Sequence, residues 1–234
     1  MKNNLFLALC LLGAQSLWGQ TAAPPPVKTA PKWDSTFRPN NYDLKAGLFK
    51  SFPNSKKDVI FLGNSITAGV DWNELLGMKN ARNRGISGDI TFGVLQRLDE
   101  VIEGKPAKVF LLIGINDISR NIPDSLIVEN YKKIITRIQQ ASPKTKIYLQ
   151  TLMPVNNTFT QFKNHYNKDQ HIEFINKSLR EMAQTCKVQL IDLHPQFLDS
   201  EGKLKKEFTE DGLHLNAAGY THWASILKNG NYLK

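Results

Sequence analysis

Four short apolar runs recur along the chain from residue 57 onward, separated by longer and more polar stretches. An uninterrupted apolar run of four to six residues is typical of a β-strand that is buried on both faces. Glycine follows the first run directly, which favours a turn at the end of that strand. We therefore expect buried strands at residues 59–62, 109–113, 147–152 and 188–191.

Apolar residues between these runs are spaced by three and four positions, as in Val94, Leu95, Leu98, Val101 and Ile102. This spacing places them on one face of an α-helix. We expect helices at residues 90–103, 125–141, 172–186 and 217–227. Strands that alternate with helices of this length predict an α/β fold, with right-handed crossovers and a mostly parallel sheet covered by helices on both faces.

The first 19 residues have the pattern of an export signal. Lys2 supplies a positive charge, and residues 5–12 are an apolar run too short for a membrane span, which needs about 20 apolar residues. We expect cleavage after residue 19 and a periplasmic or secreted protein with no transmembrane segment in the mature chain. Lipid attachment at Cys10 is the alternative, and it is disfavoured because Leu9 is large where a small residue is expected.

Three further segments follow the signal. Residues 20–32 are rich in proline and small residues, which predicts an extended linker. Residues 33–56 contain several aromatic side chains and end in a pattern typical of a short amphipathic helix, so we expect an arm packed on the main domain. Residues 57–234 form that domain.

Composition narrows the function classes. The chain has 234 residues and a net charge of +9, but its basic residues are scattered, which argues against nucleic-acid binding. A chain of this length can build a core without a metal or a disulfide. Cys186 alone remains after signal cleavage, so no intramolecular disulfide is expected. The pattern does not indicate an oligomeric state.

We expect the functional residues just after the predicted strands, because ligands of doubly wound sheets bind beyond the carboxyl ends of the strands. Asp211 and His214 are three positions apart, a spacing that brings a base and its orienting carboxylate to one side of a turn. Four blocks combine glycine with polar residues, and the second of them follows the short stretch at residues 81–84. The blocks are Gly63-Asn64-Ser65, Gly85-Ile86-Ser87-Gly88-Asp89, Gly114-Ile115-Asn116-Asp117 and Asp211-Gly212-Leu213-His214.

These blocks, in this order, resemble those of the SGNH or GDSL family of serine esterases and acylhydrolases over residues 57–227. The resemblance implies a three-layer α/β/α sandwich in which a flavodoxin-like parallel sheet places the first strand between the second and third. It identifies residues 57–234 as an SGNH hydrolase domain.

The same resemblance implies the roles of single residues. Ser65 is the expected nucleophile, His214 its base and Asp211 the carboxylate that orients the base. The backbone N–H groups of Ser65 and Gly88 and the side-chain amide of Asn116 are the expected oxyanion-hole donors. This chemistry needs no cofactor and no metal.

Several positions have structural interpretations beside the functional one. Ser65 alone could cap a helix that starts near Ile66. Asp117 is expected to hold the Asn116 loop through backbone hydrogen bonds. Asn64 stands where the family usually has aspartate, which removes a charge beside Ser65. The remaining histidines have no spacing that converges on a metal and are interpreted as ordinary polar positions: His165, His171, His194 and His222.

The stretch from residue 151 to about 171 shows no helix pattern and mixes polar with aromatic residues, including Phe159, Phe162 and Tyr166. Such a loop overhangs the strand ends and can shape a substrate pocket, although plain surface packing is the alternative. Its composition favours a glycan ester or small-molecule ester over a lipid. An exported esterase of this kind resembles bacterial carbohydrate and sialate O-acetylesterases. The resemblance implies a serine esterase that hydrolyses short-chain acyl esters, chiefly acetyl esters, of carbohydrates. The alternatives are a lysophospholipase or thioesterase of the same family, and a non-catalytic glycan-binding protein.

Overall fold

The computed structural model describes residues 33–234, so the predicted signal at residues 1–19 and the linker at residues 20–32 lie outside the described residues. A parallel sheet with strand order β2-β1-β3-β4-β5 forms the centre of the fold. This order confirms the flavodoxin-like sheet, with the first strand between the second and third. The strands are β1 (Val59–Gly63), β2 (Ala81–Gly85), β3 (Lys108–Leu112), β4 (Lys146–Gln150) and β5 (Gln189–Ile191).

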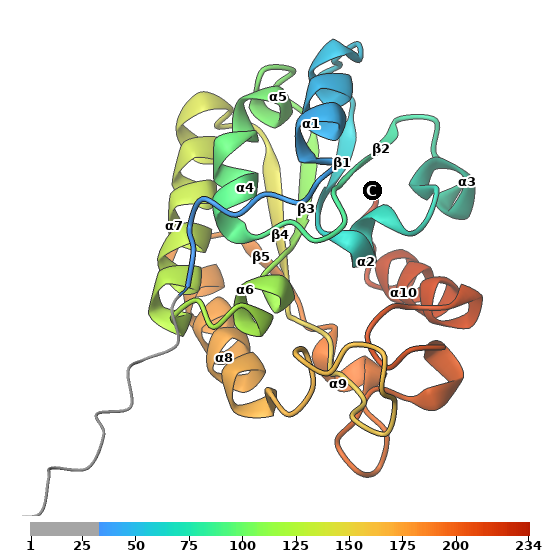
Figure 1. The fold of residues 1–234 in the computed structure, drawn as a ribbon. Coiled ribbons are helices and arrows are strands. Elements are labelled where there is room, and N and C mark those ends of the chain that lie inside the picture. The colour runs from blue at the N-terminus through green and yellow to red at the C-terminus, as the bar shows by residue number, and fades with distance from the viewer. Residues whose placement is uncertain (1–32) are drawn as a thin grey trace, which may run out of the picture. The chain divides into compact units, whose positions relative to one another are not determined.

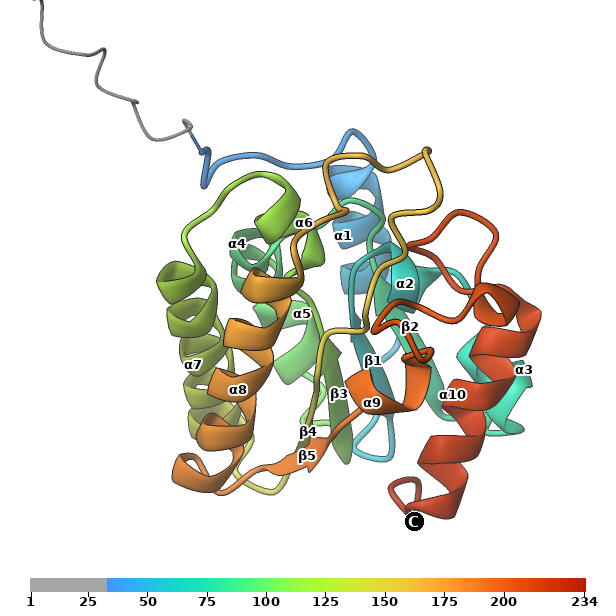
Figure 2. The ribbon, with the colours of Figure 1, turned by 90° about the horizontal axis from the view of Figure 1, so that it is seen from below.

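Helices cover both faces of this sheet. Figures 1 and 2 show α4, α7 and α8 on one face and α3 and α10 on the other. The longer helices are α1 (Tyr42–Ser51), α7 (Asp124–Ala141), α8 (Asp169–Thr185) and α10 (Ala217–Asn229). The shorter ones are α2 (Ser65–Ala68), α3 (Trp72–Leu76), α4 (Thr91–Gln96), α5 (Leu98–Ile102), α6 (Ile115–Ser119), α9 (His194–Phe197) and the 3-10 helix η1 (Lys206–Phe208). The predicted three-layer α/β/α sandwich is therefore confirmed.

A row of aromatic rings crosses the sheet and fills the layer beneath α3 and α10. Phe61, Phe110 and Tyr148 face one another on three adjacent strands, with ring centroids 4.8 and 4.5 Å apart. Trp72 stacks on Phe61 at 3.9 Å, and Trp223 of α10 packs edge-on against Trp72. Large buried rings of this kind contribute strongly to core stability, which explains why these apolar runs hold the sheet together.

The prediction of one helix over residues 90–103 is wrong, because the chain breaks at Arg97 between α4 and α5. The Arg97 guanidinium is buried and forms ion pairs with Asp89 at 3.0 Å and Glu100 at 3.4 Å. It also donates to the carbonyl oxygens of Gly63 and Arg84. Several acceptors thus satisfy the buried charge, as the interior requires. The break lets Arg97 reach the ends of β1 and β2.

The aromatic residues of the arm pack against this charged cluster. Tyr42 and Phe49 are buried, and the Tyr42 hydroxyl donates to the Gly93 carbonyl oxygen at 2.6 Å. The Arg84 and Arg97 guanidinium groups lie 5.0 and 5.8 Å from the centroid of the Phe49 ring, within the range of cation–π contacts. The described arm and the main domain belong to one compact unit.

Between residues 33 and 234, none of the helices combines the length and the apolar character needed to cross a bilayer. Cys186 is the one cysteine in this part of the chain, and its thiol is free.

Candidate active site

The first block of the site follows β1 directly. Gly63 pairs with Gly85 on one side and Leu112 on the other, so β1, β2 and β3 end at the same level. A Cβ at position 63 would lie 2.2 Å from the Leu112 carbonyl oxygen, and only glycine permits this close approach. The first turn after β1 therefore lies directly against the neighbouring strand end.

Asn64 and Ser65 begin the short helix α2. The Asn64 side-chain oxygen accepts a hydrogen bond from the Ile66 N–H at 3.0 Å, so Asn64 is the N-cap and Ser65 is the first helical residue. The interpretation of Ser65 as a mere helix cap is therefore wrong. Asn64 supplies the capping oxygen without the negative charge of the aspartate that the family usually has here.

Asp211 and His214 are brought together by a tight turn. One carboxylate oxygen of Asp211 accepts hydrogen bonds from the Leu213 N–H at 2.9 Å and the His214 N–H at 2.7 Å. Thr209 supports the turn, because its hydroxyl oxygen accepts from the Gly212 N–H at 2.9 Å. The turn places the two side chains on the same side, as the three-residue spacing predicts.

The three side chains form one hydrogen-bonded chain. The second carboxylate oxygen of Asp211 lies 2.7 Å from His214 Nδ1, and His214 Nε2 lies 2.9 Å from Ser65 Oγ. Burial alone would raise the pKa of Asp211, but its bonds from the His214 and Leu213 N–H groups and the His214 ring hold that pKa below its ordinary value. An ionised carboxylate only accepts, so the imidazole proton lies on Nδ1 and Nε2 can accept the Ser65 hydroxyl proton.

The three candidate oxyanion donors follow three adjacent strands: Ser65 follows β1, Gly88 follows β2 and Asn116 follows β3. Gly88 has a φ of +81°, a conformation that favours glycine, and a Cβ there would lie 3.2 Å from the arm residue Pro39. Within the described chain, neither the Gly88 N–H nor the Ser65 N–H donates a hydrogen bond to a backbone carbonyl oxygen. Asn116 of α6 donates from Nδ2 to the Asp89 carbonyl oxygen at 3.0 Å. That bond holds α6 beside the Gly88 loop.

Asp117, next to Asn116, has the structural role expected of it. Its carboxylate is fully buried and accepts from the Thr91 N–H at 3.0 Å and from the Thr91 hydroxyl at 2.6 Å. Burial raises the pKa of Asp117 to about 7, although the bonds from Thr91 oppose the shift. These contacts hold the Asn116 loop against the start of α4.

The loop between β4 and α8 contacts the site at three points. It contains no helix or strand between residues 151 and 168, as expected. The Phe162 ring packs edge-on against His214 at 4.9 Å, and the Tyr166 hydroxyl donates to the Asp211 backbone oxygen. His165 Nε2 lies 3.0 Å from Asn116 Oδ1. Figure 2 shows this loop at the same end of the sheet as α2 and α6.

His165 is the residue that sequence reasoning missed. The sequence predicts an ordinary polar position for His165, whereas its ring contacts Asn116, which lies 49 positions away in the sequence. Its place in a loop that follows a strand end was the available signal. Within residues 33–234, no His, Cys, Asp and Glu side chains gather as a metal-binding group.

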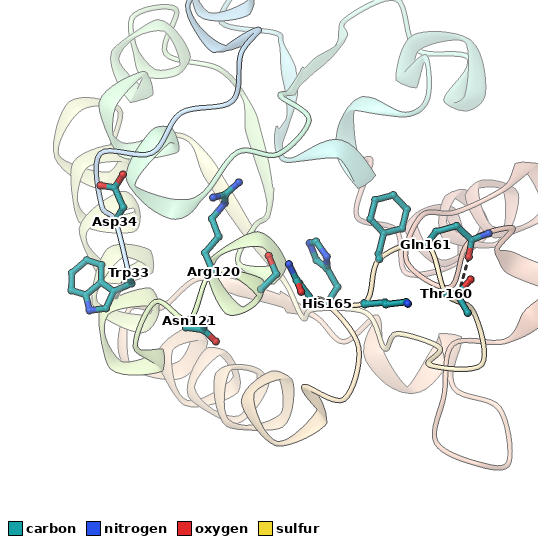
Figure 3. Close-up of a pocket in the computed structure, with 11 residues that line it drawn as sticks. Trp33, Asp34, Arg120, Asn121, Thr160, Gln161 and His165 are labelled. Atoms are coloured by element: carbon teal, nitrogen blue, oxygen red, sulfur yellow. Dashed lines mark hydrogen bonds between the residues drawn. The ribbon is translucent and has the colours of Figure 1, made fainter. Parts of the chain in front are cut away.

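A polar groove of about 750 Å³ starts beside His165. The turn after α6 contributes Arg120 and Asn121, and the loop between β4 and α8 contributes Thr160, Gln161, Phe162 and Lys163. Figure 3 shows Trp33 and Asp34 at one end of the groove, Thr160 and Gln161 at the other, and Arg120 and His165 between them. Arg120 is held in place by the Phe37 ring, whose centroid lies 3.1 Å from the guanidinium carbon.

An apolar cavity of about 10 Å³ lies beside the nucleophile candidate. It is lined by the two neighbours of Ser65 and by apolar residues of β3 and the loop after β4: Asn64, Ile66, Leu112, Leu152, Met153 and Val155. A space of this size holds about one water molecule. This apolar cavity is therefore much smaller than the groove at His165.

Comparison with known proteins agrees with the sequence motifs. Residues 61–222 match the model of the GDSL-like Lipase/Acylhydrolase family. The chain is 28% identical over 170 residues to the platelet-activating factor acetylhydrolase IB subunit alpha2 of Rattus norvegicus, covering 70% of this chain and 71% of that protein.

Two solved structures share the fold. One, from Streptococcus pneumonia and provisionally named a platelet activating factor, has a TM-score of 0.76 and 31% identity, covering 83% of this chain and 93% of that one. The other, an acetyl xylan esterase, has a TM-score of 0.62 and 26% identity, covering 74% of this chain and 98% of that one.

Proposed function

Because the chain belongs to the GDSL-like lipase/acylhydrolase family, we propose that this acylhydrolase removes acetyl or other short acyl groups from carbohydrate esters, with Ser65 as its nucleophile. The observation that carries the proposal is the hydrogen-bonded chain from Ser65 through His214 to Asp211, with separations of 2.9 and 2.7 Å. These distances are within the range that a serine nucleophile and its base require.

Acylation begins with the Ser65 hydroxyl. His214 Nε2 takes its proton as Oγ attacks the ester carbonyl carbon, and a tetrahedral intermediate forms. Asp211 stabilises the imidazolium and keeps its ring oriented, because its carboxylate already accepts from Nδ1. His214 then gives the proton to the leaving alcohol, and the acyl group remains on Ser65.

The negative charge of the intermediate falls on the former carbonyl oxygen. The free N–H groups of Ser65 and Gly88 and the second N–H of the Asn116 amide are the proposed donors to it. Donors that are already oriented need no rearrangement during the reaction, and losing one typically costs about 10²-fold to 10³-fold in kcat.

Deacylation uses the same groups in reverse. A water molecule attacks the acyl carbon, and His214 Nε2 accepts one of its protons. The second tetrahedral intermediate collapses, the carboxylic acid leaves, and Ser65 Oγ regains the proton from His214. No metal or organic cofactor takes part in this proposed cycle.

The proposal of a short acyl group is supported by the small size of the apolar cavity next to Asn64 and Ile66. The apolar cavity there measures about 10 Å³, too small to bury the methylene groups of a long acyl chain, each of which would gain about 0.8 kcal/mol from burial. The names of two similar proteins, an acetylhydrolase and an acetyl xylan esterase, both contain the acetyl group.

The proposal that the alcohol part of the ester is a sugar is supported by the open groove. Its lining combines hydrogen-bonding side chains such as Asn121 and Gln161 with the rings of Trp33 and Phe162. Polar groups that fix hydroxyls, together with rings that cover apolar faces, suit a glycan better than a lipid tail. The name acetyl xylan esterase points in the same direction.

The proposal includes export from the cytoplasm. The pattern of residues 1–19 favours a cleaved signal, which would place the enzyme in the periplasm or outside the cell. In this proposal the linker spans residues 20–32, the arm residues 33–56 and the hydrolase domain residues 57–234.

A chain-length series of 4-nitrophenyl esters tests the acyl preference. We expect kcat/KM to be highest for acetate or propionate and to fall at least 10-fold by octanoate, because a longer chain would lie against polar groups. Steady-state rates for C2 to C12 esters measure this. A maximum at C8 or longer would favour the lysophospholipase or thioesterase alternative.

The proposal that the substrate is a carbohydrate ester is tested by measuring acetate release from acetylated xylan, pectin fragments and sialic acids. Release from at least one glycan, at a kcat/KM above that for 4-nitrophenyl acetate, is expected. Turnover of the nitrophenyl ester with no release from any glycan would contradict the carbohydrate assignment. Glycan binding with no turnover of any ester would favour the non-catalytic alternative.

A further inference from the structure

The orientation of the Asn116 amide is determined by two partners. Its Nδ2 lies 3.0 Å from the Asp89 carbonyl oxygen, and a carbonyl oxygen can only accept a hydrogen bond. The oxygen Oδ1 must therefore face the other way, where His165 Nε2 lies at 3.0 Å. One of the two Nδ2 hydrogens is used by Asp89, which leaves the second for a ligand.

His165 must donate in this contact, because Asn116 Oδ1 only accepts. The proton of the imidazole therefore lies on Nε2. Burial, followed by the neighbouring His214 and Arg120, lowers the pKa of His165 to about 4, while Asp211 opposes the shift. The ring is thus neutral in the pH range of ordinary esterase assays, and the tautomer with the proton on Nε2 is the one that satisfies Asn116.

The same loop holds His165 and the proposed triad together. The Phe162 ring packs edge-on against both histidines, at 5.8 Å from His165 and 4.9 Å from His214. The Tyr166 hydroxyl accepts from the Phe162 N–H at 3.2 Å and donates to the Asp211 backbone oxygen. Three neighbouring loop residues therefore contact the base, its carboxylate residue and the proposed oxyanion donor.

We propose that His165 is a positioning residue that holds the Asn116 carboxamide with its free N–H turned toward the substrate oxyanion. This inference rests on the proposed function, in which Asn116 is an oxyanion donor. His165 does not touch the reacting atoms in this account. Its hydrogen bond prevents the amide from rotating, so the donor is already oriented when the tetrahedral intermediate forms.

The test compares two variants that differ in hydrogen bonding. His165→Phe keeps a ring against Phe162 but loses the donor, whereas His165→Gln retains an N–H at the end of its side chain. We expect His165→Phe to lower kcat for 4-nitrophenyl acetate by about 10-fold to 100-fold, part of the loss of a complete donor, with KM within twofold. His165→Gln should recover kcat to within about fivefold of the wild type.

A double-mutant cycle with Asn116→Ala separates positioning from general structural support. If His165 acts only through Asn116, then His165→Phe in the Asn116→Ala background should change kcat by less than about twofold. Losses that multiply, or an unchanged kcat in His165→Phe, would overturn the inference. Equal losses in His165→Phe and His165→Gln would do the same.

Two controls keep the result interpretable. Circular dichroism and urea denaturation of each variant show whether it folds, and His165→Gln remains informative if His165→Phe does not. His171→Phe changes an exposed histidine that pairs with Asp124 and should leave kcat unaltered. Loss of turnover in Ser65→Ala with normal turnover in His165→Phe would reject this inference alone, whereas full turnover in Ser65→Ala would reject the proposed function.

Discussion

Replacing Ser65 with alanine should lower kcat for 4-nitrophenyl acetate by about 10⁴-fold to 10⁶-fold, the range found when a triad nucleophile is removed. The variant lacks the oxygen that attacks the carbonyl carbon, and it leaves His214 Nε2 without its partner at 2.9 Å. The proposed oxyanion donors remain, so a small residual rate above that of water is expected. Initial-rate kinetics on purified protein measure the loss.

The control for this experiment is Ser178→Ala. Ser178 is a half-buried residue of α8, and its hydroxyl donates to the Phe174 carbonyl oxygen of the same helix at 2.9 Å. Its variant should retain the wild-type rate. A Ser65→Ala protein that folds normally and keeps more than about one hundredth of the rate would show that another group is the nucleophile.

Replacing Asp211 with asparagine should lower kcat by about 10⁴-fold with little change in KM, as in a triad whose carboxylate is neutralised. Asn Oδ1 can still accept from the Leu213 and His214 N–H groups, so the turn is preserved. The new amide donates toward His214 Nδ1 where the carboxylate accepted. The imidazole proton then moves to Nε2, which can no longer accept the Ser65 proton.

The chain offers a matched control for this change. Asp124 and His171 form a second Asp–His contact, at 2.8 Å, on the surface between α7 and α8. Asp124→Asn should leave kcat within twofold of the wild type. A loss of less than 10-fold in Asp211→Asn would mean that Asp211 does not set the imidazole tautomer, and the triad assignment would fail for that residue.

The sequence pattern predicted the buried strands well, because the central strands are covered on both faces. β1, β3 and β4 consist almost wholly of buried residues and appear as continuous apolar runs. β2 was visible only as a short stretch before Gly85, since it is an edge strand with the sequence Ala-Arg-Asn-Arg-Gly. Its Arg84 is buried through an ion pair with Glu100, a contact that no local pattern indicates.

The site residues divide in the same way. The members of the proposed triad, Ser65, Asp211 and His214, could be predicted from the sequence because each lies in a compact motif beside a strand end or within a tight turn. The contact between His165 and Asn116 spans 49 positions, and the groove combines the arm, α6 and the loop after β4. The break at Arg97 likewise depends on acceptors from two other strands. Contacts of this kind arise only from the folded arrangement.

Labelling with a fluorophosphonate tests the central claim, that Ser65 is the nucleophile, most directly. Intact-mass analysis should show one adduct per chain, and peptide mapping should place it on Ser65. Ser65→Ala should take up no label, and Ser178→Ala should be labelled like the wild type. A stoichiometric adduct on any other residue, or labelling of Ser65→Ala at the wild-type rate, would contradict the account.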